Sequence, residues 1–226
     1  MTDKSITNKF DVLAKDYDKN RKNIIPNLDQ LYGTVVEIAR AEIPEPKILD
    51  LGAGTGLLTE KLSERFARGQ FTLVDISNEM LNIARERFNE RTNFSYINQD
   101  YLEADLGDNF DLVVSSLSIH HLSNKEKQYL YSKVYAILNP NGIFINADQV
   151  LGPSRENEYI YRRNWIEKIE AGDLSVESKN KIMEILNKHD KPASLENNLK
   201  WLKKCGFRNV DVFYKYYNFS VMYGVK

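Results

Sequence analysis

The stretch Ile48-Leu49-Asp50-Leu51-Gly52-Ala53-Gly54-Thr55-Gly56 predicts a buried strand that runs directly into a glycine-rich turn. Glycine is needed where the backbone must approach a ligand closely or adopt a positive φ angle. A helix expected after the turn would point its free N–H groups at the space above it, which favours a carboxylate or phosphate there. Because a glycine-rich turn also suits a plain connection between a strand and a helix, a second signal is needed to assign a ligand.

Short runs of aliphatic and aromatic residues alternate with longer amphipathic runs over most of the chain. We expect helices between the short runs. Ser77 would cap one over 77–91, and Ser123 with Glu126 would form the capping box of another that ends in a turn at 139–142. Such alternation is typical of an α/β fold whose mostly parallel sheet carries helices on both faces. The expected strands are 47–51, 70–76, 93–98, 110–116 and 142–148.

Two regions lie outside the alternation and flank its core. The first is expected to hold two helices split near Pro26, and the second is a polar, helix-prone stretch after the fifth strand. Gly206 is expected to end the last helix, ahead of a closing hairpin. We predict one domain with an N-terminal helical lid (1–43), a cofactor-binding core (44–150), a helical cap insertion (151–191) and a closing helix and hairpin (192–226).

Composition and charge narrow the classes of partner. The chain has 226 residues, of which 42% are hydrophobic, so it can bury one sizeable core. Lys and Arg number 31 against 32 Asp and Glu, and the net charge of -1 gives no field that would gather nucleic acid or an anionic membrane. We therefore expect a small-molecule partner rather than nucleic acid, and a homodimer is compatible with these numbers.

The cysteine count and the first residues bear on location. Cys205 is the single cysteine, which excludes an intramolecular disulfide framework and a cysteine-only metal cage. Residues 1–9 mix charged and polar side chains, and no run approaches the roughly 18 apolar residues of a spanning helix. We expect a cytoplasmic protein with no membrane segment and no metal site.

An acidic residue provides the second signal. Asp75 closes the second expected strand, and positions 56 and 75 differ by 19. At that interval after a glycine-rich turn, an acidic side chain can reach the ribose hydroxyls of an adenosine. Asp75 could instead cap the helix that begins at Ser77. Together with the turn, the interval favours a nucleoside ligand across the first two strand ends.

Polar segments also follow the third and fourth expected strands. Asp100 and Tyr101 come just after the third, where a carboxylate can accept the exocyclic amine of adenine, although a surface-loop Asp fits that position as well. The segment 115–122, which begins with Ser115 and Ser116, leaves the fourth strand beside the switch point where ligands of open α/β sheets bind. We therefore expect this segment to face the reaction space.

Taken as a set, these segments resemble the Rossmann-like S-adenosylmethionine-dependent methyltransferases, over roughly residues 10–226. The resemblance implies a seven-stranded sheet with an antiparallel last strand and S-adenosyl-L-methionine as the cofactor. The segment 10–21, which contains Tyr17, is similar to the lid that folds over the cofactor in many members. The resemblance is carried by 49–56, Asp75, Asp100, 110–122, 138–142 and 205–207.

The same resemblance implies roles for individual residues. Gly52 to Gly54 would touch the methionine moiety, and Asp75 would bind the ribose. Asp100 and Tyr101 would flank the adenine. The complete set of predicted cofactor contacts is Tyr17, Arg21, Asp50, Gly52, Ala53, Gly54, Asp75, Ile76, Met80, Asp100, Tyr101, Ser115 and Ser116.

The sequence gives less information about the acceptor of the methyl group than about the cofactor. A base is needed only when the acceptor must lose a proton, and His120 and His121 are the candidates because an imidazole titrates near neutral pH. Alternatively, they hold the loop after the fourth strand by hydrogen bonds. Aromatic and basic residues of the cap could line the acceptor pocket or simply pack the cap. They are Tyr159, Tyr161, Arg162, Arg163 and Trp165.

Three other functions compete with methyl transfer. A nicotinamide-dependent dehydrogenase would need glycine or alanine where Leu57 stands, so that its helix could pack closely below a pyrophosphate. Segments around Pro26 and Asn218, and at 194–196, are similar to carboxy-S-adenosylmethionine synthases of tRNA modification. Those enzymes hold a carboxylated cofactor with a cap arginine, whereas Lys179, Lys181 and Met183 occupy that stretch here. Third, intact binding motifs also suit a protein that senses the cofactor without turnover.

Overall fold

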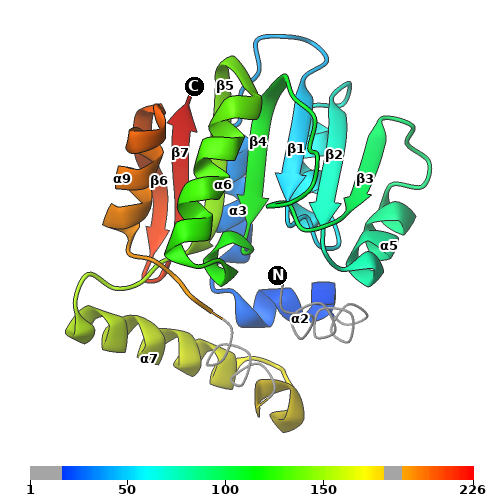
Figure 1. The fold of residues 1–226 in the computed structure, drawn as a ribbon. Helices are drawn as coiled ribbons and strands as arrows, with labels where there is room; N and C mark the ends of the chain where they lie inside the picture. Colours follow the sequence, from blue (N-terminus) through cyan, green and yellow to red (C-terminus); the bar gives the residue numbers. More distant parts are fainter. Residues whose placement is uncertain (1–16, 181–189) are drawn as a thin grey trace.

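The structure is a computed structural model that describes residues 17–180 and 190–226 (Figure 1). The strands are β1 (Lys47–Leu51), β2 (Gln70–Asp75), β3 (Phe94–Asn98), β4 (Phe110–Ser116), β5 (Leu138–Gln149), β6 (Arg208–Tyr216) and β7 (Phe219–Val225). The helices are α2 (Tyr17–Ile24), α3 (Leu28–Ile38), α4 (Leu57–Arg65), α5 (Asn78–Arg87), the short 3-10 helix η2 (Ile119–His121), α6 (Asn124–Ile137), α7 (Arg155–Ala171) and α9 (Leu195–Cys205).

The strands form a single seven-stranded sheet in the order β3-β2-β1-β4-β5-β7-β6. β1 pairs in parallel with β2 and β4, and β4 pairs in parallel with β5. β7 runs antiparallel to both of its neighbours. The predicted Rossmann-like α/β fold with an antiparallel last strand is therefore confirmed, and its switch point lies between β1 and β4.

Helices cover both faces of the sheet and bury one apolar cluster on each. One cluster includes Leu31 of α3, Leu62 of α4 and Leu81 of α5, all fully buried. The other includes Val134 of α6 and Leu202 of α9. Figure 1 shows α6 and α9 in front of the sheet and α3 behind it. Because both faces are covered, the central strands have the continuous apolar runs on which the sequence prediction relied.

Local sequence signals set most helix ends as expected. The Ser77 hydroxyl accepts from the Met80 N–H at the start of α5, and Ser123 and Glu126 form the capping box of α6. Gly206 ends α9 with a φ of 106°.

The turn expected at 139–142 is an irregular first part of β5. Leu138 already pairs with Phe110, and the register shifts before Ile143 pairs with Leu112. Asn141 takes up the shift with a φ of 64°, in the left-handed region that Asn tolerates. Strand pairing thus begins earlier than the turn residues indicated.

Two helices lie beyond the carboxyl ends of the parallel strands. Figure 1 shows α2 and α7 at that edge, and the Trp165 indole N–H of α7 donates to the Ile24 carbonyl at the end of α2, at 2.7 Å. The first sixteen residues of the expected lid and residues 181–189 of the expected cap lie outside the described residues. The division of the chain into four parts remains a prediction.

Among residues 17–180 and 190–226, no helix combines the length and the apolar character that crossing a membrane requires.

Candidate functional site

The glycine-rich turn after β1 is tightly enclosed. Gly52 has a φ of 69° and Gly54 a φ of 57°, which are left-handed conformations that favour glycine. A Cβ at Gly52 would lie 2.0 Å from the Ser118 hydroxyl oxygen, whereas a Cβ at Gly54 would meet nothing within 4 Å. The two glycines therefore serve different needs: Gly52 allows the loop after β4 to approach, and Gly54 supplies a bend.

Asp75 lies at the end of β2 and contacts this turn directly. One carboxylate oxygen accepts from the Gly54 N–H at 2.8 Å, and the other accepts from the Ser77 N–H at 2.9 Å. The side chain is half-buried and turned toward the turn, not into solvent. Each carboxylate oxygen has more than one acceptor site, so Asp75 can also accept from ribose hydroxyls.

Asp50 is a buried carboxylate directly below the turn. The Thr59 hydroxyl donates to its Oδ2 at 2.5 Å, while Oδ1 is shielded from solvent and accepts no hydrogen bond from the described residues. Burial raises the pKa of Asp50 to about 7, although the Thr59 hydrogen bond opposes the shift and the negative charge of Asp75 adds to it. A buried acceptor without a donor is costly, so Oδ1 is suited to a cationic or N–H ligand group.

The N-terminal helix α2 closes over the turn. The Thr55 hydroxyl donates to Asp18 of α2 at 2.5 Å, and Arg87 of α5 pairs with Asp18 and donates to the Thr55 carbonyl. The space left beside the turn is only about 10 Å³, roughly room for one water molecule. Ligand entry therefore requires α2 or the Ser118 loop to move. The space is lined by Arg21, Tyr32, Gly52, Ala53, Gly54, Thr55, Leu57, Leu58 and Ser116.

The predicted adenine contacts lie at the neighbouring strand end. Asp100 Oδ1 accepts from the Leu102 N–H at 2.9 Å, which holds the loop after β3. Tyr101 is nearly buried, and its hydroxyl lies 3.3 Å from the Ser118 hydroxyl, beside Gly52. The structure thus brings Tyr101 against the glycine turn, together with Ser118 of the segment 115–122, which was expected to face the reaction space but was not among the predicted contacts.

The other predicted cofactor contacts divide into two groups. Arg21 and Ser116 line the small space, and the Ser116 hydroxyl lies 3.2 Å from that of Tyr32. Ser115 and Met80 are fully buried, and the Ser115 hydroxyl donates to the Leu51 carbonyl, which joins β4 to β1. The remaining two are Ile76, which is half-buried after β2, and Tyr17, which begins α2 and whose side chain lies outside the described part of the chain.

A second and larger cavity, of about 220 Å³, opens at the carboxyl end of β5, beside α7. Tyr161, Arg162 and Trp165 line it, as the sequence analysis allowed. Tyr159 and Arg163 are absent from its lining. Instead, the Arg163 guanidinium lies over the Tyr159 ring, 5.8 Å from its centroid, on the exposed face of α7. The remaining lining residues are Gln149, Val150, Leu151, Glu158, Ile166, Asp190, Pro192 and Asn218.

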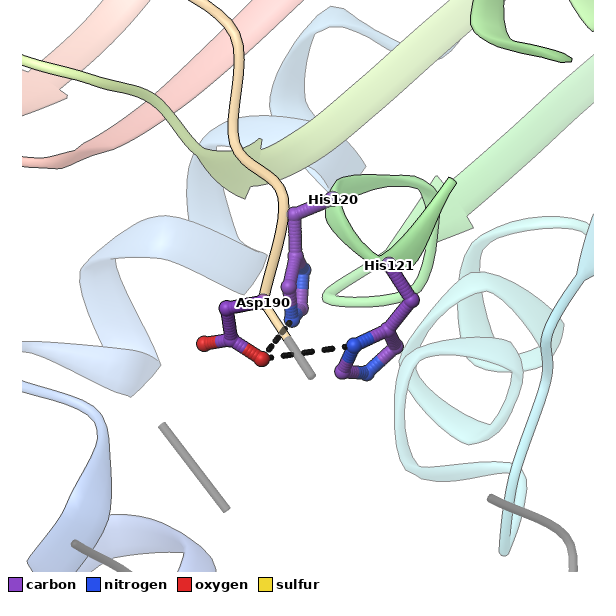
Figure 2. A group of neighbouring side chains, drawn as sticks. All are labelled: His120, His121 and Asp190. Atoms are coloured by element: carbon purple, nitrogen blue, oxygen red, sulfur yellow. Dashed lines mark ion pairs between the residues drawn. The ribbon is translucent and has the colours of Figure 1, made fainter. Parts of the chain in front are cut away.

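His120 and His121 follow β4 in η2 and share one carboxylate, that of Asp190 (Figure 2). His120 Nδ1 lies 2.6 Å from Asp148 Oδ1 at the end of β5. Asp190 Oδ1 lies 3.6 Å from His120 Nε2 and 3.3 Å from His121 Nδ1. The two imidazole rings are 4.0 Å apart between centroids. Both histidines therefore belong to a buried polar cluster with two carboxylates, in which His120 is held most firmly.

The electrostatics of the cluster separate the two histidines. Burial disfavours the charged form of His120, but the carboxylates of Asp148 and Asp190 outweigh it and raise the pKa of His120 to about 9. Burial and the charge of His120 lower the pKa of His121. The two carboxylates thus favour the protonated form of His120, whereas the surroundings of His121 favour its neutral form. The prediction that one of them acts as a base stays a prediction.

Several residues of the site escaped the sequence analysis. Asp148 and Gln149 end β5 at the carboxyl edge of the sheet. Asp148 closes the expected strand 142–148 and Gln149 follows it, which was a signal that could have selected both. Asp190 gave no such signal, because it lies near the end of the predicted cap and shares no motif spacing with the histidines. Its backbone is placed by tertiary contacts, as the next residue, Lys191, donates its N–H to the His120 carbonyl at 2.9 Å.

Comparisons with known proteins agree with this geometry. A family model described as a methyltransferase domain matches residues 48–142, from β1 to the first part of β5. A carboxy-S-adenosyl-L-methionine synthase from Helicobacter hepaticus is 27% identical, over 95% of this chain and 92% of that protein. A ubiquinone/menaquinone biosynthesis C-methyltransferase from Vibrio campbellii is 28% identical, over 78% of this chain and 68% of that protein. The methyltransferase domain over residues 48–142 and these relatives indicate an S-adenosylmethionine-dependent methyltransferase.

Solved methyltransferase structures share the fold. Human N-acetylserotonin methyltransferase, determined with S-adenosylmethionine, has a TM-score of 0.61 at 14% identity. Phosphoethanolamine N-methyltransferase 2 from Haemonchus contortus, also with S-adenosylmethionine, has a TM-score of 0.65 at 23% identity. This chain is covered to 96% and 89%, but it spans only 55% and 43% of those chains. These neighbours show the fold alone, and the family match with the curated relatives supports S-adenosylmethionine as the cofactor of this methyltransferase.

The donors and acceptors around the turn of this methyltransferase fit that cofactor. The buried Oδ1 of Asp50 and the cation of Arg21 suit the ammonium and carboxylate of a methionine moiety, and Asp75 suits a ribose. The individual contacts remain predictions.

Proposed function

We propose that this methyltransferase transfers a methyl group to a small-molecule acceptor that binds in the cavity below α7. The observation that carries this proposal is the cavity itself. It lies at the end of β5, on the far side of β4 from Asp75, and it is separate from the enclosed glycine turn. With about 220 Å³ of space, it suits a ligand smaller than a drug-sized molecule.

Residues of the chain would hold the cofactor and the acceptor in place, and none of them would form a covalent bond to either. When bound, S-adenosylmethionine supplies an electrophilic methyl group on a sulfonium, and no protein nucleophile is required. Arg162 and Glu158 offer opposite charges to an acceptor from α7, and Gln149 offers an amide from β5. Trp165 adds an apolar surface and joins α7 to α2. Holding both reactants at fixed positions lowers the entropic part of the barrier.

The test is transfer of an isotopically labelled methyl group from S-adenosylmethionine to fractionated cell extract by the purified full-length protein. We expect label in a small-molecule fraction and an equal amount of S-adenosylhomocysteine. The Asp75→Ala variant serves as the control for cofactor binding. The Arg162→Ala variant should bind the cofactor normally and transfer less label. Label confined to nucleic acid or protein, or cofactor binding without turnover of any fraction, would contradict the proposal.

A second candidate is a carboxy-S-adenosylmethionine synthase. The specific observation in its favour is that similarity to the Helicobacter hepaticus synthase extends over nearly the whole of both chains. Lys179 lies in the stretch where the cap arginine of that activity is expected, while positions 181 and 183 lie outside the described residues. Arg162 is a cap cation in another position, at the wall of the cavity.

Mass spectrometry of the ligand carried through purification separates the two candidates. A carboxymethyl sulfonium is heavier than a methyl sulfonium, so the retained ligand distinguishes them directly. We expect S-adenosylmethionine or S-adenosylhomocysteine. Recovery of the carboxylated form would favour the second candidate.

A further inference from the structure

Three metal-ligating side chains from distant parts of the chain converge beside the cavity. The donor atoms of His120, His121 and Asp190 all lie within 4.8 Å of one another, and Figure 2 shows both imidazoles turned toward the Asp190 carboxylate. The distances from Asp190 Oδ1 to His121 Nδ1 and His120 Nε2 are 3.3 and 3.6 Å. In a tetrahedral zinc site with bonds of about 2.0–2.1 Å, neighbouring donor atoms lie about 3.3 Å apart.

Asp190 supplies an independent observation that points to a ligand. Its side chain is only 7% exposed, and Oδ1 is shielded from solvent yet accepts no hydrogen bond from the described residues. Oδ1 is also the atom that faces both imidazoles. Because a buried carboxylate oxygen without a donor is costly, this position favours a cation between the three side chains.

Asp148 holds His120 in the way that a carboxylate often holds a metal-binding histidine, through the ring nitrogen that does not bind the metal. His120 Nδ1 lies 2.6 Å from Asp148 Oδ1, so a proton on Nδ1 leaves Nε2 as the nitrogen that can bind a metal. Nε2 lies 3.6 Å from Asp190 Oδ1 and 3.3 Å from the Gln149 side-chain amide, which a bound ion would have to displace. Metal-bound histidines usually have such a carboxylate or carbonyl partner on their other nitrogen. The segment that holds Asp190 is also fixed, because the buried Lys127 ammonium donates to the Lys191 carbonyl at 2.7 Å. The three donors are therefore positioned before any ion binds.

We propose that His120, His121 and Asp190 bind one divalent transition-metal cation, and that Asp148 positions His120 from behind. Two imidazole nitrogens and one carboxylate oxygen suit zinc(II) and leave a fourth position open. Asp190 also lines the cavity below α7, so the ion would lie at its wall. This goes beyond the proposed methyl transfer and makes the two histidines ligands rather than bases. It also departs from the sequence analysis, which predicted no metal site.

The test uses the full-length protein after removal of metals with a chelator, in the absence of cofactor and acceptor. Zinc(II) is titrated in competition with a chromophoric chelator, and the retained metal is counted by elemental mass spectrometry. We expect one zinc per chain. Asp190→Asn and His121→Ala should each weaken zinc binding by more than about 100-fold, since even loss of a supporting carboxylate costs about 10- to 100-fold. Asp148→Asn should fall in that smaller range.

The matched control is Asp108→Asn, which removes an exposed carboxylate in the loop before β4. It should bind zinc like the wild type. Circular dichroism of each variant in chelator checks that it folds. If a variant of His121 or Asp190 does not fold, the visible spectrum of the wild type loaded with cobalt(II) tests the site instead. Cobalt(II) bound by histidine and carboxylate in a tetrahedral site has strong absorption bands, and we expect to see them.

A wild-type protein that retains no stoichiometric zinc would overturn the proposal, and so would ligand variants that bind zinc as the wild type does. In either case the cluster holds no metal ion, and His120 in its protonated form bridges the carboxylates of Asp148 and Asp190. Because neither measurement involves methyl transfer, failure of the metal site and failure of the proposed function are distinguishable.

Discussion

The carboxyl edge of the sheet has two halves that are built in different ways: a cofactor half around the glycine-rich turn and an acceptor half around the cavity below α7. The cofactor half takes Gly52, Gly54 and Asp75 from a continuous stretch of chain over β1 and β2, and it leaves about 10 Å³ of space. The acceptor half takes side chains from β5, α7 and the segments before α9 and β7, and it leaves about 220 Å³. The first is short-range in sequence and closed, whereas the second is assembled from distant segments and open.

The difference shows what each half requires of its residues. The cofactor half depends on backbone conformation, namely positive φ at two glycines and two N–H groups that donate to one carboxylate. The acceptor half depends on packing, since Trp165 of α7 contacts Ile24 of α2 and Phe219 of β7. We therefore expect substitutions in the cofactor half to act through strain and charge, and those in the acceptor half to act through docking of α7.

The largest effect should come from Gly52→Ala. Its Cβ would both strain a positive φ and displace Ser118, whereas Gly54→Ala strains φ in open space. We expect a loss of about 3–4 kcal/mol in the free energy of unfolding for Gly52→Ala and about 1 kcal/mol for Gly54→Ala. Denaturant titration of both variants measures the difference. Equal losses would mean that Ser118 yields freely and that the turn is less enclosed than described.

A change that should stabilise the cofactor half is Asp50→Asn. The pKa of Asp50 is about 7 in the folded chain against an ordinary value of 3.8. The folded state therefore favours the protonated form, and this contribution to stability is lost as the pH rises from about 4 to about 7. Because Asn does not titrate, the variant should gain about 3–4 kcal/mol relative to the wild type between pH 4 and pH 8.

Unfolding of the Asp50→Asn variant at several pH values checks this expectation. A difference between variant and wild type that stays constant with pH would show that Asp50 is ionised throughout. The same variant should bind cofactor more weakly at pH 8, because it lacks the negative charge that we expect to face the methionine ammonium.

Asp75→Ala tests the nucleoside contact of the cofactor half. Loss of hydrogen bonds to a charged acceptor should weaken S-adenosylhomocysteine binding by about 2 kcal/mol, or about 30-fold. Calorimetric titration measures this, with Asp111→Ala, a substitution at the opposite end of the sheet, as the control. Unchanged affinity would remove Asp75 from the binding site and leave it as a support for the turn.

The smallest effect is expected in the acceptor half, from Trp165→Phe. The variant keeps most of the apolar surface but loses the N–H that donates to the Ile24 carbonyl. We expect a loss of about 1 kcal/mol in stability, with cofactor affinity changed less than about twofold. Thermal unfolding and calorimetry measure the two quantities. A large loss of cofactor affinity would instead show that α7 and the glycine turn act as one unit.

Most of the fold could be predicted because its signals are local. The Ser77 cap, the Ser123 capping box and the Gly206 helix end depend on residues within a few positions, and each was found where expected. The first part of β5 was predicted as a turn from Pro140 and its neighbours, because strand pairing with Phe110 cannot be read from those residues. Boundaries that depend on a partner strand were thus the ones that moved.

The candidate site divides in the same way. The sequence alone determined the glycine turn, since backbone sterics restrict which residues can occupy its positions, and it determined the α/β fold and the place of Asp75 at the end of β2 through the local alternation of strands and helices. Only the tertiary structure decided that Asp190, 69 positions after His121, joins the two histidines, and that α2 closes the turn while α7 leaves a cavity open. Such contacts depend on how distant segments pack, and packing is a property of the whole chain that no short stretch of sequence contains.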